Sequence, residues 1–245
     1  MDERILVSPS DLLGDGVFET LHLRPSGPWL LPEHLDRLAR SAALLDLPPP
    51  PPIDLGGLEA GRTGVMRIVY TRNLLHVSVS EISEQVLRER RDGVRVLSAD
   101  LGVSVGRRPP WSLSAAKSLS YASNFAARRW AARQQADDVI WTSLEGYVLE
   151  APTSSVVWLS GDTLCTVPPA EAGILDGITA GHLLSVAGSV GLQSAFRMIT
   201  LPELAAADAM WLASSVRGLA EVTSLDGVPR GRSPWTPRLL SLLGF

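Results

Sequence analysis

The sequence predicts a mixed α/β fold (α+β elements) in two domains, and three observations lead to it. Short segments with the alternating pattern of strands are interleaved with segments whose apolar residues recur at helical spacing. The pattern changes after a stretch rich in Gly, Arg and Pro near residue 106. The 245 residues, 45% of them hydrophobic, suffice for one large domain or two small ones. We expect an N-terminal α/β domain at residues 1–103, a linker at 104–112 and a C-terminal domain at 113–245.

Local patterns predict the elements of the N-terminal half. Residues 17–23 follow a Gly-Asp-Gly turn and alternate apolar and polar side chains, as a half-buried strand does. Pro32 opens a segment with helical apolar spacing, and five prolines at 48–52 predict an extended surface link. The charged cluster at 88–93 is typical of a solvated loop. The predicted elements are strands at 17–23, 29–31, 65–72, 74–82 and 94–97 and a helix at 33–45.

The C-terminal half begins with an Ala-rich helical pattern that starts at Lys117. A second helix is entered through Gly-Ile-Leu-Asp-Gly at 173–177, and Ser-Ser-Val-Arg-Gly at 214–218 separates the two last strands. The predicted elements are helices at 117–135 and 179–190 and strands at 139–142, 147–149, 155–159, 209–213 and 221–225.

Composition and charge exclude several classes of protein. The formal net charge of −4 gives no basic surface for nucleic acid. The single cysteine, Cys165, cannot form an intramolecular disulfide, and its strand-like surroundings favour burial over reactivity. There is no apolar run of about 20 residues and no basic-then-apolar N-terminal segment. We therefore expect a cytoplasmic protein with a small-molecule substrate, without nucleic-acid or membrane partners.

The basic residues are almost all arginine. Lys117 is the only lysine, and the other 21 of the 22 basic residues are arginines. Compositional bias against lysine explains the many arginines. It leaves two interpretations of Lys117: a lysine that is present by chance, or a lysine that is needed for the chemistry of the protein. A lysine amine can lose its proton and act as a nucleophile, whereas an arginine cannot.

Three further features are compatible with a chemical role for Lys117. Glu150 ends a predicted strand, Ile178 and Thr179 open a helix with free amides, and Arg37 lies on the first helix. A nucleophilic amine, a lone carboxylate and two phosphate-binding elements are what a pyridoxal phosphate enzyme needs. Each feature also has an ordinary structural interpretation, as a strand-end carboxylate, a helix start or a surface cation. The four histidines, His22, His34, His76 and His182, show no ligand spacing, so no metal site is expected.

Five motifs occur in a familiar order along nearly the whole chain. They are Gly-Asp-Gly-Val-Phe-Glu-Thr (14–20), His-Leu-Asp-Arg-Leu (34–38), Lys-Ser-Leu-Ser-Tyr (117–121), Val-Leu-Glu (148–150) and Gly-Ile-Leu-Asp-Gly-Ile-Thr (173–179). Together they resemble the class IV aminotransferases, the fold-type IV pyridoxal phosphate enzymes. That family includes branched-chain and D-amino acid aminotransferases, some amine transaminases and aminodeoxychorismate lyases.

The resemblance implies a role for each matching residue. Lys117 would form the Schiff base with pyridoxal phosphate and move protons at the substrate carbon. Glu150 would pair with the pyridine nitrogen, and Tyr121 would hydrogen-bond the ring hydroxyl. The phosphate would be bound by Arg37, Ile178, Thr179, Ser214 and Ser215. The resemblance also implies a cofactor between the two domains and a homodimer, and it places Arg67 on the substrate side. The alternative for Arg67 is an ordinary charge at a strand edge.

The choice of reaction depends on similarities that are less specific than the five motifs. Residues 117–122 with Asn124, and the segments 136–141 and 214–218, look most like aminodeoxychorismate lyases, so we expect a lyase that makes 4-aminobenzoate and pyruvate for folate synthesis. The alternative is an aminotransferase of the branched-chain or D-amino acid type. A binding protein on an inactive scaffold would have no need of both Lys117 and Glu150. Two segments, around Asn73 and from Ser10 to Gly14, are shorter than in relatives, through deletion or through residues missing from the chain.

Overall fold

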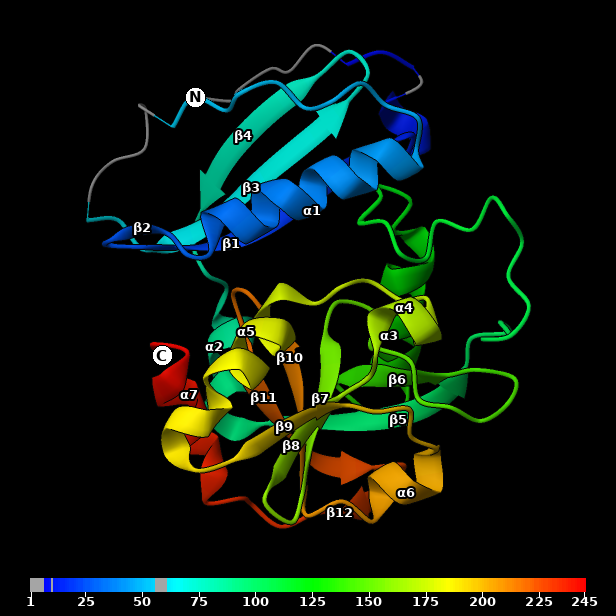
Figure 1. Cartoon of the computed structure of the whole chain (residues 1–245), viewed down its shortest axis with the longest axis vertical. Helices are drawn as coiled ribbons and strands as arrows, with labels where there is room; N and C mark the ends of the chain where they lie inside the picture. The colour runs from blue at the N-terminus through cyan, green and yellow to red at the C-terminus, as the bar shows by residue number, and fades with distance from the viewer. Residues whose placement is uncertain (1–6, 10, 56–60) are drawn as a thin grey trace. The chain divides into compact units, whose positions relative to one another are not determined.

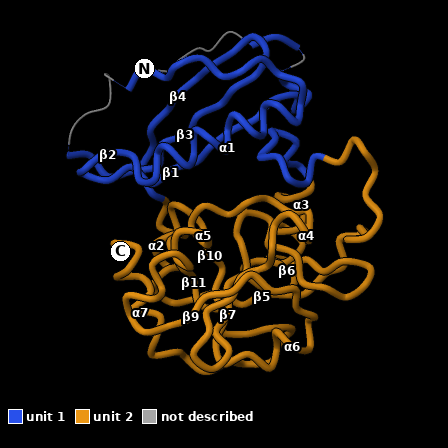
Figure 2. Tube along the Cα trace, viewed as in Figure 1, with its two compact units in different colours: residues 1–82, 113–122 blue, residues 83–112, 123–245 orange. Residues whose placement is uncertain are grey.

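The chain divides into two compact units (Figure 2). The computed structural model describes residues 7–9, 11–55 and 61–245. One unit comprises residues 1–82 and 113–122, and the other comprises residues 83–112 and 123–245. This division does not coincide with the predicted boundaries at 103 and 113. Residues 94–100 pair with strands of the second unit, while Ser118 pairs with Val17 of the first, so hydrogen bonding rather than chain order sets the limits.

The first unit is a four-stranded antiparallel sheet with one helix across a face (Figure 1). The strand order is β2-β1-β3-β4, and its core contains Val17, Leu21, Leu38, Met66 and Ile68. The alternation predicted from the sequence turns these strand residues toward the apolar stripe of the helix. The elements are η1 (Asp11–Leu13), β1 (Gly16–Arg24), β2 (Gly27–Pro28), α1 (Leu31–Leu44), β3 (Gly64–Thr71) and β4 (Leu75–Ser80).

Two connections in the first unit differ from what the sequence led us to expect. The strand predicted at 29–31 is wrong, because Leu30 has a left-handed φ of 54° and reverses the chain into α1. The hairpin between β3 and β4 closes directly, with the Thr71 amide donating to the Leu74 carbonyl at 2.8 Å. The Thr71 hydroxyl accepts from the Asn73 amide at 3.2 Å and from the Leu74 amide at 3.0 Å, so the short segment at Asn73 forms a tight turn. Ser10, in the other short segment, lies outside the described residues.

The second unit contains a larger mixed sheet. Its path is β6-β5-β11-β10-β7-β8-β9, with β12 paired to β11, and β5 runs parallel to both of its neighbours. Helices α2 and α7 pack against β11, and α5 packs against β10. The strands are β5 (Val94–Asp100), β6 (Asp138–Thr142), β7 (Ser155–Ser160), β8 (Thr163–Thr166), β9 (Gln193–Phe196), β10 (Ala209–Ser214), β11 (Gly218–Leu225) and β12 (Val228–Pro229). The helices are α2 (Glu84–Asp92), α3 (Ala122–Arg133), α4 (Pro169–Ala172), α5 (Ile178–Val186), η2 (Ala187–Val190), α6 (Leu201–Ala205) and α7 (Trp235–Leu242).

Three predictions for the second unit need correction. The charged cluster at 88–93 is not a loop, because it lies mostly within α2, which is N-capped by the Ser83 hydroxyl. The helix predicted at 117–135 begins only at Ala122. The strand predicted at 147–149 forms only isolated bridges, one of them between Val148 and Thr142. Across the described residues, no helix is both long and apolar enough to cross a membrane.

Candidate active site

Lys117 is held by backbone hydrogen bonds at the start of β1. The Phe18 amide donates to the Lys117 carbonyl at 2.9 Å, and the Leu119 amide donates to the Gly16 carbonyl at 2.8 Å. The Lys117 amide donates in turn to the buried Ser41 hydroxyl on α1 at 3.1 Å. Residues 117–119 therefore cover the edge of β1 that β2 leaves open, and this explains why the helix cannot begin at Lys117.

The Lys117 amine lies among aromatic groups. Its Nζ is 4.4 Å from the centroid of the Phe18 ring and 3.4 Å from the Tyr121 hydroxyl. The Phe18 and Tyr121 rings contact each other edge to face, with centroids 4.9 Å apart. The structure thus brings together two residues predicted for the site, Lys117 and Tyr121. Phe18 was missed, although it lies in the first of the five motifs.

Arg37 belongs to a buried polar cluster on the other face of β1. Its Nε and Nη2 donate to the two carboxylate oxygens of Glu19, each at 2.7 Å, and His34 Nδ1 is 2.7 Å from Glu19 Oε2. Burial alone would raise the pKa of Glu19, but the Arg37 charge and the hydrogen bonds from Arg37 and His34 lower this pKa to about 2. Burial lowers the pKa of His34 despite the nearby carboxylate. Because the ionised Glu19 can only accept, His34 Nδ1 donates to it.

The cluster fixes the Arg37 guanidinium between α1 and β1. Whether this guanidinium also binds a phosphate stays a prediction. Glu19 and His34 were not predicted as part of the site. Their signal was present in the sequence, since Glu19 shares the alternation of Val17 and Leu21 and therefore points into the apolar core, where a carboxylate needs a cation.

In the second unit, Glu150 follows a strand-like pairing and precedes a tight turn. The Trp141 amide donates to the Glu150 carbonyl at 2.8 Å, which aligns Glu150 with β6. The Ala151 amide then donates to the Ser154 carbonyl at 2.8 Å and closes the turn. Glu150 is half-buried, and the charge of Arg108 interacts with its carboxylate.

The predicted phosphate-binding residues of this unit meet where β10 ends and α5 begins. Ser214 is the last residue of β10, Ile178 is the first residue of α5, and the buried Thr179 and Ser215 hydroxyls are 3.4 Å apart. Gly177, the N-cap of α5, has no side chain to block the first amides, and a Cβ there would lie 2.0 Å from Ser155 Oγ. Free amides, a helix dipole and two hydroxyls make this a place suited to an anion.

The first unit holds an amine beside aromatic groups, and the second unit holds a strand-end carboxylate and a helix start suited to an anion. Each of these groups is of a kind that enzymes of amine chemistry use. The amino-transferase class IV family model matches residues 16–225. The chain therefore belongs to the class IV aminotransferases, and the mixed α/β fold predicted from the sequence is confirmed.

Several individual members of the family are similar to this chain over most of their length. The chain is 37% identical to a bifunctional aminodeoxychorismate lyase / D-amino acid transaminase of Mycobacterium tuberculosis, over 90% of this chain and 85% of that protein. It is 27% identical to the aminodeoxychorismate lyase of Bacillus subtilis, over 94% of this chain and 86% of that protein. A hypothetical aminotransferase from M. tuberculosis, solved with pyridoxal phosphate bound, has a TM-score of 0.91 at 36% identity, covering 100% of this chain and 94% of that one.

Proposed function

We propose that the protein is a pyridoxal phosphate-dependent lyase that converts 4-amino-4-deoxychorismate to 4-aminobenzoate and pyruvate. The observation that carries the proposal is the placement of the only lysine, whose amine is backed by the Phe18 ring and lies 3.4 Å from the Tyr121 hydroxyl. The likeness to relatives named aminodeoxychorismate lyase supports the choice of reaction.

Pyridoxal phosphate is the cofactor, and the side chains present fit it. The Lys117 amine suits its aldehyde, and the Glu150 carboxylate suits its pyridine nitrogen. The phosphate is suited by the start of α5 with Ile178 and Thr179, by Ser214 and Ser215, and by Arg37. When bound, the cofactor withdraws electrons from the substrate carbon that bears the amine.

Lys117 and Glu150 divide the proton chemistry between them. Glu150 would hold a proton at the ring nitrogen of the cofactor, and Tyr121 would donate a hydrogen bond to the ring hydroxyl of the cofactor. Lys117 Nζ takes the proton from the amine-bearing carbon of the substrate. In the lyase, the C–O bond to the enolpyruvyl group would then break with its electron pair on oxygen, the departing enolate would take up a proton from Lys117 and leave as pyruvate, and the substrate ring would become aromatic. In an aminotransferase, Lys117 would instead pass this proton on, and the amine would stay behind when the 2-oxo acid leaves.

The segments that resemble lyases are connected in the structure. Asp138, from 136–141, forms an ion pair with Arg217, from 214–218, at 3.2 Å. Asn124, which belongs with 117–122 in that resemblance, donates to the Pro152 carbonyl at 2.6 Å, in the turn that follows Glu150. Two of the three segments are therefore in direct contact, and the third contacts the turn that follows Glu150.

A time course with enzymatically generated 4-amino-4-deoxychorismate tests the reaction. We expect pyruvate and 4-aminobenzoate to appear in equal amounts. If a cofactor-loaded protein releases neither, the lyase proposal is wrong, and D-amino acids should then be screened against 2-oxo acids. The second activity in the name of the 37% identical relative makes D-amino acid transamination the alternative.

Arg67 is expected to bind a substrate carboxylate. It is exposed at the middle of β3 and pairs in register with Thr20 and Ser78. Strand alternation places it on the same sheet face as Phe18, one side-chain row or about 7 Å further along. Within the described residues, Arg67 forms no ion pair, so its charge is available to an anionic substrate.

An Arg67→Ala variant should therefore raise the KM for 4-amino-4-deoxychorismate about 10-fold or more, because a charge-assisted hydrogen bond contributes about 1.5–3 kcal/mol. Steady-state kinetics gives the measurement. Arg40→Ala, which removes an exposed arginine from α1, is the matched control and should leave KM unchanged. A KM shift of equal size in both variants would show that Arg67 has no specific role.

The remaining expectations are also proposals. We infer that the protein is a cytoplasmic homodimer that supplies 4-aminobenzoate for folate synthesis. Light scattering of the cofactor-loaded protein tests the dimer, which should have twice the 26.3 kDa mass of the chain.

A further inference from the structure

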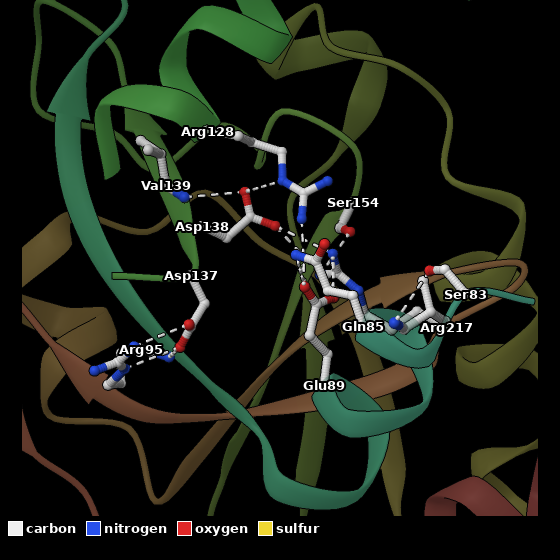
Figure 3. Close-up of polar contacts among 11 residues, drawn as sticks. Ser83, Gln85, Glu89, Arg95, Arg128, Asp137, Asp138, Val139, Ser154 and Arg217 are labelled. Carbon is white, nitrogen blue, oxygen red and sulfur yellow. Dashed lines mark hydrogen bonds and ion pairs between the residues drawn. The ribbon is translucent and has the colours of Figure 1, made fainter. Parts of the chain in front are cut away.

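Four charged side chains form a closed ring in the second unit, three of them buried and the fourth, Arg128, about a quarter exposed (Figure 3). Arg217 Nη2 lies 2.9 Å from Glu89 Oε2 and 3.2 Å from Asp138 Oδ2. Arg128 closes the ring, with Nη2 3.3 Å from Glu89 Oε1 and Nε 3.8 Å from Asp138 Oδ1. The charges cancel, and they come from α2, α3, β6 and the turn between β10 and β11. Desolvation offsets much of the attraction in such a ring, so stability alone does not account for it.

Arg217 lies in the turn that carries the proposed phosphate contact Ser215. The backbone of this turn is fixed from a second side, because Arg90 on α2 donates to the Val216 carbonyl at 2.6 Å and to the Arg217 carbonyl at 3.0 Å. The Arg90 guanidinium in turn lies 4.3 Å from the centroid of the Phe245 ring. Both the Arg217 side chain and the carbonyls of Val216 and Arg217 are therefore held in place.

The same ring reaches the segment that follows Glu150. Arg217 Nη1 donates to the Ser154 hydroxyl at 3.3 Å, and Ser154 closes the turn that begins after Glu150. Asn124, one helical turn before Arg128 on α3, holds this turn through the Pro152 carbonyl. One set of contacts thus connects the residue proposed for the pyridine nitrogen with a residue proposed for the phosphate.

We propose that Arg217 is a positioning residue for the cofactor, which fixes the Glu150 turn and the Ser215 turn relative to each other before pyridoxal phosphate binds. The inference rests on the proposed cofactor roles of Glu150, Thr179 and Ser215. A binding site whose turns are already ordered binds pyridoxal phosphate more tightly, because less conformational entropy is lost on binding. Loss of Arg217 should loosen the phosphate end, so the preference for pyridoxal phosphate over pyridoxal, which lacks the phosphate, should fall.

The experiment compares the dissociation constants of pyridoxal phosphate and pyridoxal, measured by equilibrium dialysis with the full chain. The double variant Arg217→Met/Glu89→Gln removes one charge of each sign and leaves Arg128 paired with Asp138. We expect its ratio of pyridoxal to pyridoxal phosphate dissociation constants to fall about 10-fold. Arg90→Met leaves the ring intact, releases only the carbonyls of the turn, and should lower the ratio in the same direction. It also tests the proposal if the double variant does not fold.

Two controls separate the possible outcomes. Arg88→Met removes an exposed arginine from the same helix, α2, and should leave the ratio unchanged. Ser215→Ala should lower the ratio directly. If Ser215→Ala lowers the ratio but the folded Arg217 and Arg90 variants do not, the positioning role is overturned. If Ser215→Ala leaves the ratio unchanged, the proposed phosphate role of Ser215 is wrong, and the inference is overturned with it. A purely structural defect would weaken both ligands equally and leave the ratio unchanged.

Discussion

A Lys117→Ala variant is expected to release pyruvate and 4-aminobenzoate at least about 10³-fold more slowly than the unaltered enzyme. The reason is that no other lysine is present in the sequence to replace the lost amine. The variant should keep its fold, since Lys117 is held by its backbone, and its side chain is only half-buried. The rate is measured in the same time course that tests the reaction.

Lys117→Arg separates the charge of this residue from its nucleophilicity. The arginine keeps a cation near Phe18 but cannot form the covalent attachment. Both variants should therefore lose the mass increase that borohydride reduction of the cofactor-loaded protein leaves on the chain. Turnover in Lys117→Arg within about tenfold of the unaltered enzyme would contradict the assigned role.

Glu19→Gln should lower the free energy of unfolding at pH 7 by about 3 kcal/mol or more, because it leaves the Arg37 guanidinium buried beside a neutral group. The sign of the pH dependence follows from the lowered pKa of Glu19, which is about 2 in the folded chain against 4.5 for the ordinary group. The carboxylate stabilises the fold fully above about pH 4.5, and this contribution is lost as the pH falls toward 2. A pKa difference of this size corresponds to about 3 kcal/mol.

Urea unfolding at pH 7 and at intervals between pH 5 and pH 3 gives the measurement. The unaltered protein should lose stability steeply over this range, and Glu19→Gln should lose less. Asp36→Asn provides the matched control, since it removes an exposed carboxylate from α1. An effect of Glu19→Gln no larger than that of Asp36→Asn would show that the buried cluster does not stabilise the first unit.

The sequence predicts elements well where burial follows a simple period. β1 and α1 were predicted within two residues at each end, because their apolar residues repeat every second position or at helical spacing. α2 was missed for a physical reason. Its buried residue is Glu89, which packs against arginines rather than against a hydrophobic core. The sequence of the helix therefore has the pattern of a solvated cluster of charges. The turn at Trp29 and Leu30 was missed because a left-handed leucine has no sequence signature.

The residues of the candidate site likewise fall into those that the sequence predicts and those that only the fold reveals. Lys117, Tyr121 and Thr179 were named from motifs, and Ser215 from the resemblance of its loop. The structure places the Lys117 amine 3.4 Å from the Tyr121 hydroxyl and the Thr179 hydroxyl 3.4 Å from that of Ser215. Partners that come from a different element were not found, because spacing along the chain carries no information about them. Arg217 lay within a segment noted for its resemblance, yet only the fold reveals that Asp138 and Glu89 surround it.

The return of residues 113–122 to the first unit has a consequence for the modularity of the chain. The boundaries at residues 82, 112 and 122 mean that no single cut separates the two units, and neither corresponds to one uninterrupted stretch of gene. A fragment that ends at residue 82 would lack the segment 117–119 and would expose the edge of β1 to pairing with other chains. The segment that carries Lys117 therefore also completes a sheet, so the shuffling of whole domains between genes cannot move this sheet intact without that segment.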